Sequence, residues 1–173
     1  KFSKINPIHL MQDLLTIVIP CYNEELYIGR TLRHIKRQLG TDGVRIIISD
    51  AGSVDSTLSI IEKLKNQLDL RVEVVKGGLP AVGRNAGADL ATTPYLLFID
   101  ADITFTDKTA ISRALACLQN EDFAMVGTCP KYRGEFDFRA KLIFSVNRMI
   151  TWYLSKTKPF AIGGFILVRR LVF

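Results

Sequence analysis

Two carboxylates, Asp100 and Asp102, directly follow an apolar run at residues 95–99. A carboxylate beside a hydrophobic core is costly unless it is paired, hydrogen-bonded or bound to a cation. Magnesium and manganese ions are commonly held by one or two carboxylates together with the phosphates of a substrate. The spacing therefore predicts a divalent-metal site. A turn that leads into a helix cap at Thr104 or Asp107 is the alternative.

A third carboxylate, Asp50, ends another apolar run and begins the segment DAGSVDST. Gly52 relieves the turn, and Ser53 or Asp55 can cap the following helix, so Asp50 is left for another role. Its carboxylate could accept a hydrogen bond from a nucleobase imide or from a ribose hydroxyl. A carboxylate that only shapes the turn fits the same sequence.

A glycine-rich segment, GGLPAVGRNAG at residues 77–87, leads into a predicted helix. Backbone N–H groups at a helix N-terminus favour an anion, and Arg84 can pair with a phosphate through two hydrogen bonds. The segment matches neither a Walker loop nor the GxGxxG pattern. Its small residues also suit close packing of the helix, so both interpretations stay open.

The polar segments lie between elements that alternate in type along the chain. Short apolar runs predict buried strands at residues 15–19, 44–49, 70–75 and 95–99. Apolar residues at helical spacing predict helices at residues 24–39, 55–68, 81–91 and 107–118. This alternation predicts an α/β fold with a mostly parallel central sheet and helices on both faces. Because ligands bind at the carboxyl ends of such strands, the polar segments should converge on one site.

The composition predicts a globular chain and argues against a nucleic-acid partner. The 173 residues include 48% hydrophobic ones, and 23 Lys and Arg against 17 Asp and Glu give a net charge of +6. Residues 131–173 carry the excess, and the sequence lacks zinc-finger spacing, basic heptads and an aromatic RNA-binding signature. Three cysteines without metal spacing predict a reducing compartment, and two histidines give little support to a histidine-based site. We therefore expect a cytoplasmic location.

A basic, amphipathic segment at residues 138–154 predicts a helix near the C-terminal end. Such a helix can lie in a membrane interface, where its basic residues meet anionic headgroups. It would then place the protein at the cytoplasmic face of the membrane. The alternatives are an ordinary helix packed on the sheet, or a basic region in which Arg169 and Arg170 steer a phosphate group.

Four motifs in this order resemble those of the family 2 glycosyltransferases, which have the GT-A fold. They are VIPCYNEE (18–25), DAGSVDST (50–57), GRNAGAD (83–89) and FIDAD (98–102). The segment AIGGFILVRR at residues 161–170 is similar to the glycine pair before a strand in the acceptor half of that family. The resemblance runs from about residue 14 to Phe173, and it implies a Rossmann-like sheet.

The resemblance implies a nucleotide-sugar donor linked to UDP or GDP, a divalent ion (Mn²⁺ or Mg²⁺), and a saccharide or lipid-linked acceptor. The positions that match the family's nucleotide-binding residues are Pro20, Tyr22, Glu24, Asp50, Arg84, Asp100 and Ala101. Among these, Asp50 would contact the base and Arg84 the base or diphosphate. Asp102 would be the main metal ligand, and Asp100 would contact the metal or the ribose.

The sequence departs from the family pattern in its catalytic base, an Asp or Glu expected after the glycine pair. No such residue is recognisable before Phe173, so the inverting mechanism is implied by the family alone. We expect a single GT-A domain over residues 1–173. Residues 14–130 would bind the donor, and residues 131–173 would begin an acceptor-side part that continues beyond the given sequence.

Two other functions fit parts of the same pattern. A nucleotide-sugar-binding module would need no catalytic base of its own. A nucleotidyltransferase would use a related sheet, but it usually has a glycine-rich loop with a basic residue after the first strand. The sequence CYNEE stands at that position here, which counts against this alternative.

Overall fold

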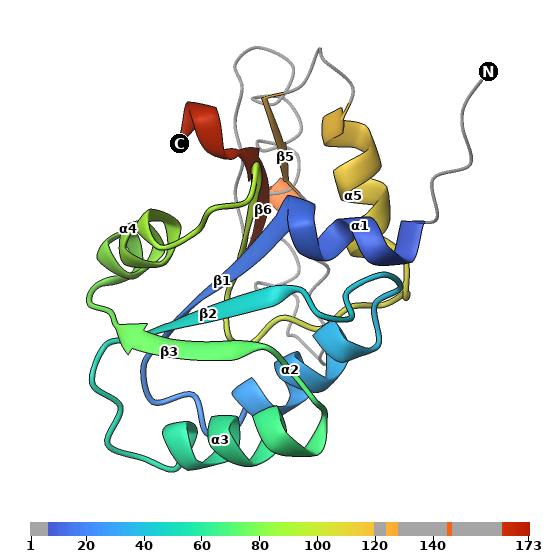
Figure 1. The fold of residues 1–173 in the computed structure, drawn as a ribbon. Helices are drawn as coiled ribbons and strands as arrows, with labels where there is room; N and C mark the ends of the chain where they lie inside the picture. The colour runs from blue at the N-terminus through green and yellow to red at the C-terminus, as the bar shows by residue number, and fades with distance from the viewer. Residues whose placement is uncertain (1–6, 120–123, 128–144, 147–163) are drawn as a thin grey trace, which may run out of the picture.

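The computed structural model describes residues 7–119, 124–127, 145–146 and 164–173, and within them six strands form one sheet (Figure 1). The strand order is β3-β2-β1-β4-β6-β5. The strands are β1 (Leu15–Cys21), β2 (Arg45–Asp50), β3 (Val72–Lys76), β4 (Tyr95–Ile99), β5 (Met125–Gly127) and β6 (Phe165–Arg169). The first four run parallel, and β6 lies antiparallel between β4 and β5. The prediction of a mostly parallel α/β sheet is confirmed.

Helices cover both faces of the sheet, as the sequence predicts. They are α1 (Pro7–Leu14), α2 (Ile28–Lys36), α3 (Thr57–Gln67), α4 (Pro80–Asp89) and α5 (Ala110–Gln119), followed by the short 3-10 helix η1 (Arg170–Val172). Figure 1 shows α2 and α3 side by side along one face, and α4 on the opposite face. The helix expected at residues 24–39 begins only at Ile28, because residues 25–27 form a turn in which Tyr27 has a φ of −120°, outside the helical range.

Burial on both faces explains why the strands are continuous apolar runs rather than alternating ones. Successive side chains of a strand point to opposite faces. Ile17 and Ile19 therefore join the larger core that α2, α3 and α5 cover, whereas Val18 joins a smaller core with Phe98 beneath α4. If helices covered only one face of the sheet, the side chains on the other face of each strand would be exposed to water.

One glycine, Gly87, lets α4 lie directly on the sheet. Gly83 and Gly87 are one turn apart and face the strands; a Cβ atom at Gly87 would overlap the Val18 side chain. A Cβ atom at Gly83 would lie 3.4 Å from the Cβ atoms of Pro20 and Ser49. This contact confirms the packing interpretation of the small residues, and it brings the intervening Arg84 toward the carboxyl edge of the strands.

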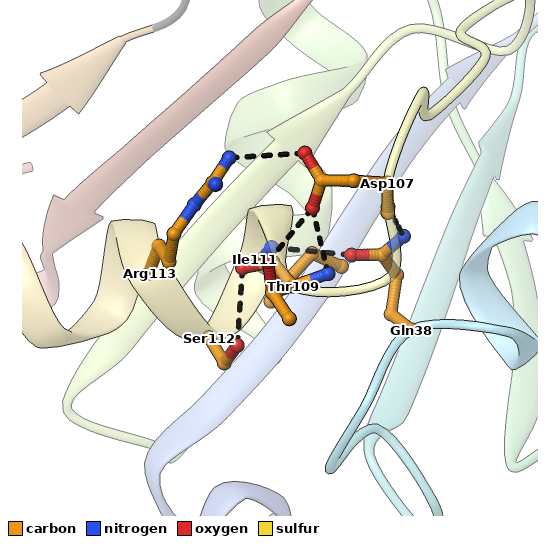
Figure 2. Close-up of polar contacts among 6 residues, drawn as sticks. All are labelled: Gln38, Asp107, Thr109, Ile111, Ser112 and Arg113. Atoms are coloured by element: carbon orange, nitrogen blue, oxygen red, sulfur yellow. Dashed lines mark hydrogen bonds and ion pairs between the residues drawn. The ribbon is translucent and has the colours of Figure 1, made fainter.

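The end of α2 is joined to the start of α5 through Gln38, whose side chain is only 4% exposed (Figure 2). Its amide Nε2 donates to the Asp107 carbonyl at 2.7 Å, and its Oε1 accepts the Ile111 N–H at 3.3 Å. Asp107 in turn accepts the N–H and the hydroxyl of Thr109 at 2.7 and 2.9 Å, and Arg113 at 3.0 Å. These bonds fix the far end of the loop that begins with the two carboxylates of β4.

Some of the predictions concern segments that the structure describes only in part. Apart from residues 145 and 146, the helix expected at 138–154 lies outside the described residues, and the boundary near residue 130 stays a prediction. Within the described part, none of the helices combines the length and the apolar character needed to cross a membrane. Arg169 pairs with Tyr95 at the start of β4, which is the edge opposite to Asp100. Neither it nor Arg170 is therefore placed to steer a phosphate beside Asp100.

We predict that Gln38→Ala lowers the free energy of unfolding by about 1–3 kcal/mol, because it leaves buried backbone groups without their partners. Urea denaturation measures this change. The matched control is Gln67→Ala at an exposed position of α3, which should change stability by no more than about 0.5 kcal/mol. Equal losses in the two variants would contradict the structural role of the Gln38 amide.

A second prediction concerns the acid dependence of stability at Asp107. Hydrogen bonds from the Thr109 N–H and hydroxyl, together with the Arg113 charge, lower the pKa of the Asp107 carboxyl below its usual 3.8. A lowered folded-state pKa contributes stability above the usual value, and this contribution is lost as the pH falls through the folded-state pKa. Asp107→Asn should therefore be less stable than the parent at neutral pH, and the difference in stability should narrow as the pH falls below 3.8. Urea midpoints across this range test it, and a constant difference would contradict it.

Candidate active site at the carboxyl edge of the sheet

Three parallel strands end beside one another at the same edge of the sheet. Cys21 at the end of β1 pairs with Asp50 at the end of β2, and β4 lies on the other side of β1. The loops that follow hold residues 22–27, 51–56 and 100–109. The convergence expected from the sequence is thus present.

Arg84 and Asp100 form the closest ion pair of this edge. Arg84 Nη2 lies 2.6 Å from Asp100 Oδ1, and the two side chains are 27% and 41% exposed. The Arg84 Nε atom is buried and has no hydrogen-bond partner among the described residues. The pair therefore places a positive group directly against the first carboxylate of the DAD segment.

Gly164, which directly precedes strand β6, supports this pair. Its carbonyl accepts the Asp100 N–H at 2.9 Å, and a Cβ atom at Gly164 would lie 2.7 Å from Asp100 Oδ2. The backbone of Gly164 does not have a positive φ, so space rather than conformation accounts for a glycine here. The start of β6 thus leaves room for the carboxylate that faces Arg84.

The backbone after Asp100 is held by helix α2. The Thr31 hydroxyl donates to the carbonyls of Ala101 at 2.5 Å and Ile103 at 3.1 Å, and Arg30 donates to the carbonyl of Asp102 at 3.2 Å. The Ala101 side chain is 3% exposed and belongs to the main core. A nucleotide could therefore contact Ala101 only through its backbone. The side chain of Asp102 is exposed.

Glu24 faces the same group of carboxylates from the loop after β1. Burial raises the pKa of Glu24 above its usual 4.5, and the negative charges of Asp102, Asp100 and Asp55 raise it further. Several carboxylates that disfavour one another's charge are the electrostatic condition that a bound cation relieves. Glu24 and the DAD segment therefore form one acidic region.

The oxygen donors of this region suit a hard divalent ion. The described residues contain no group of three or more His, Cys, Asp or Glu side chains arranged to hold a metal by themselves. Asp100 and Asp102 are nevertheless sufficient for Mg²⁺ or Mn²⁺ when substrate phosphates and water supply the other ligands. The residues fit such an ion together with a phosphate-bearing substrate.

Asp50 is 8% exposed and shapes its own loop. Its Oδ2 accepts the N–H groups of Gly52 and Ser53 at 2.9 Å each, and its Oδ1 accepts the Ser53 hydroxyl at 2.5 Å. The turn-forming role is therefore confirmed. A carboxylate has about four acceptor positions, so one remains for a ligand, and the contact with a base stays a prediction.

The remaining predicted residues line the loop after β1. Tyr22 is 56% exposed, and Pro20 is half-buried against α4. Cys21 is buried, and desolvation together with the charge of Asp50 raises the pKa of its thiol to about 12. A thiol that stays protonated is a poor nucleophile, which agrees with leaving Cys21 out of the predicted chemistry.

The sequence analysis missed several residues that hold the site. Thr31 was assigned only to the helical pattern, although its hydroxyl fixes the DAD loop. Asn23 and Glu25 were quoted within CYNEE but given no role, and both contact the loop after β2. The run of three consecutive polar residues at 23–25 is the one signal that could have indicated the contacts of Asn23 and Glu25.

The sheet order and the acidic carboxyl edge place this chain among α/β proteins of the GT-A fold. A model described as Glycosyl transferase family 2 matches residues 16–173. The chain belongs to this family. The resemblance drawn from the four motifs is therefore confirmed, and so is the predicted fold.

Similar proteins include glycosyltransferases, some of them solved with a nucleotide sugar bound. The processive diacylglycerol beta-glycosyltransferase of Mycoplasma genitalium is 30% identical over 118 residues, which are 65% of this chain and 34% of that protein. The solved structures include a mannosyltransferase of Pyrobaculum calidifontis with GDP-Man and Mn²⁺, at a TM-score of 0.75 and 20% identity over 99% of this chain and 49% of that one. TarS 1–349 of S. aureus with UDP-GlcNAc has a TM-score of 0.57 and 26% identity over 72% of this chain and 37% of that one. The chain thus spans half or less of these proteins.

We predict that Gly164→Ala lowers the free energy of unfolding by about 1–3 kcal/mol, because the added methyl group overlaps the Asp100 carboxylate. The loss should be smaller, but not abolished, when Asp100→Ala has already removed Oδ2, because the added atom would still lie 2.9 Å from Asp100 Cβ and Ile103 Cδ1. Gly83→Ala is the matched control, since its Cβ atom would meet neighbours at 3.4 Å, an ordinary contact distance. Urea denaturation of the four variants tests this, and the same loss in both backgrounds would contradict it.

Proposed function

We propose that this chain is the donor-binding part of a metal-dependent glycosyltransferase that transfers a sugar from a UDP- or GDP-linked donor to an acceptor hydroxyl. The observation that carries the proposal is the Arg84–Asp100 ion pair beside the exposed Asp102 at the carboxyl edge of the sheet. A nucleoside diphosphate needs both a cationic partner and a divalent ion, and this edge offers a group for each. Membership of glycosyltransferase family 2 supports the same donor class.

Each predicted residue has a role that its position allows. Pro20, Tyr22 and Glu24 would border the base and ribose, and the remaining acceptor position of Asp50 would bind the base. The Arg84 guanidinium, whose side chain is 27% exposed, would donate to the base or to a diphosphate oxygen. These assignments follow the family's motifs, and each agrees with the exposure and partners of the side chain.

The metal would be held by Asp102 with help from Asp100, and Mn²⁺ and Mg²⁺ both suit these oxygen ligands. When bound, such an ion stabilises the negative charge that develops on a leaving diphosphate. The protein residues would orient the diphosphate between the acidic region and Arg84. A solved relative of the same fold carries GDP-Man and Mn²⁺, which supports this choice of cofactor.

The acceptor side of the proposal rests on the family and on the sequence. We propose a saccharide or lipid-linked acceptor, an inverting reaction, and a cytoplasmic location with peripheral membrane contact through residues 138–154. A diacylglycerol glycosyltransferase among the relatives supports a lipid-linked acceptor. The catalytic base is not assigned to a residue of this chain.

We predict that the chain binds UDP or GDP only in the presence of Mn²⁺ or Mg²⁺, and that Asp102→Asn weakens this binding about tenfold or more, which is about 1.4 kcal/mol. Removing one negative ligand should lower the affinity for the ion that bridges to the diphosphate. Isothermal titration with UDP and with GDP, in Mn²⁺ and in chelator, measures both effects.

Asp69→Asn is the matched control for this experiment. Asp69 is exposed, has a φ of 49° that asparagine tolerates, and lies at the end of the sheet away from the site. Asp69→Asn removes one negative charge, as Asp102→Asn does, but away from the site. The variant should therefore bind nucleotide as the parent does. Nucleotide binding that is equally tight in chelator would overturn the role of the metal.

A further inference from the structure

The loop after β1 and the loop after β2 are joined by reciprocal hydrogen bonds, although they lie some 30 residues apart in the sequence. The Asn23 N–H donates to the Ser53 hydroxyl oxygen at 2.9 Å, and the Asn23 side-chain Oδ1 accepts the Val54 N–H at 2.9 Å. Asn23 thus provides hydrogen-bond partners for both the Ser53 side chain and the Val54 backbone of the opposite loop. Because Val54 is 86% exposed, the rate at which its N–H exchanges with water reports on this hydrogen bond.

The same pattern recurs two residues later. The Glu25 N–H donates to Asp55 Oδ2 at 3.2 Å, and Glu25 Oε2 accepts the Ser56 N–H at 3.0 Å. Between the two, the Glu24 N–H donates to the hydroxyl of Thr57 at 2.7 Å. The five bonds form a two-sided clasp, by which we mean the contacts of residues 23–25 with residues 53–57.

The clasp leads directly to Asp50. The Ser53 hydroxyl that accepts from the Asn23 N–H also donates to Asp50 Oδ1 at 2.5 Å. Asn23 itself has a φ of 52°, a left-handed conformation that asparagine and glycine adopt more readily than other residues. This conformation lets both the N–H and the side chain of Asn23 face the opposite loop.

We propose that Asn23 is a positioning residue for the base-binding side of the site. Its side chain holds the Val54 N–H, and this bond keeps the adjacent Ser53 in place, where the Ser53 hydroxyl accepts the Asn23 N–H and donates to the carboxylate of Asp50. The inference rests on the proposed function for the identity of the ligand, a nucleoside diphosphate. The clasp holds Asp50 in a single orientation before any ligand arrives, so that little ordering remains to be done on binding. It also leaves the Glu24 side chain free to face the acidic region.

Three variants separate the hydrogen bonds from the backbone conformation. Asn23→Gly keeps the left-handed backbone but removes the acceptor oxygen. The double variant Asn23→Asp with Glu25→Gln keeps an acceptor oxygen at both positions and leaves the net charge unchanged. Ser53→Ala removes only the hydroxyl that connects Asn23 to Asp50.

Two measurements are made on each variant: hydrogen exchange of the Val54 amide by NMR, and the Kd of UDP and GDP with Mn²⁺. In Asn23→Gly, we expect Val54 exchange to accelerate at least tenfold and the nucleotide affinity to fall about tenfold. The charge-neutral double variant should stay within about threefold of the parent in both measurements. Ser53→Ala should weaken nucleotide binding with Val54 exchange little changed, and it carries the test if Asn23→Gly does not fold.

The outcomes distinguish this inference from the proposed function. If the parent chain binds neither nucleotide, the proposed function fails, and Val54 exchange still decides whether the clasp exists. Unchanged Val54 exchange in Asn23→Gly would overturn the inference. So would faster exchange combined with unchanged nucleotide affinity, because the clasp would then not position the site. Equal losses in the double variant and in Asn23→Gly would also overturn it.

Discussion

The ion pair between Arg84 and Asp100 depends on three separate elements coming within contact of one another. Helix α4 brings the arginine, β4 ends at the carboxylate, and β6 begins beside it, directly after Gly164. Each approach needs a residue without a side chain, Gly87 under the helix and Gly164 beside the carboxylate. The charge arrangement of the site is therefore a consequence of how closely backbones can pack, and not only of which charged residues are present.

Much of the fold could be predicted from the sequence, because its main constraint is local. A parallel strand covered on both faces is a continuous apolar run, and β4 matches the prediction residue for residue at 95–99. The start of α2 could not be placed in the same way. In its first expected turn, Tyr27 has a φ of −120°, which lies outside the helical range, so the regular helix begins only at Ile28. The N–H groups of Glu24 and Glu25 bond to Thr57 and Asp55 of another loop, and the apolar pattern carries no sign of these contacts.

The candidate site was predictable only in part, for a related reason. Asp50 and Asp100 could be found because each follows a strand, and the ends of parallel strands converge. The contacts that orient them could not, because Gly164 lies more than 60 residues from Asp100 in sequence and directly before an antiparallel strand that the apolar pattern did not predict. For Ala101, the motif predicted a contact with the nucleotide but not the burial of the residue. Its side chain lies in the core.

The three consecutive residues Asn23, Glu24 and Glu25 show how a short loop can serve two purposes at once. The outer two are bonded to the neighbouring loop, and the middle one faces the carboxylates of β4. Repulsion between Glu24 and those carboxylates would push an unrestrained loop away from the site. The bonds made by its two neighbours oppose this motion, so the acidic region can keep its concentrated negative charge. An edge that is held together in this way is suited to a ligand that brings its own cation.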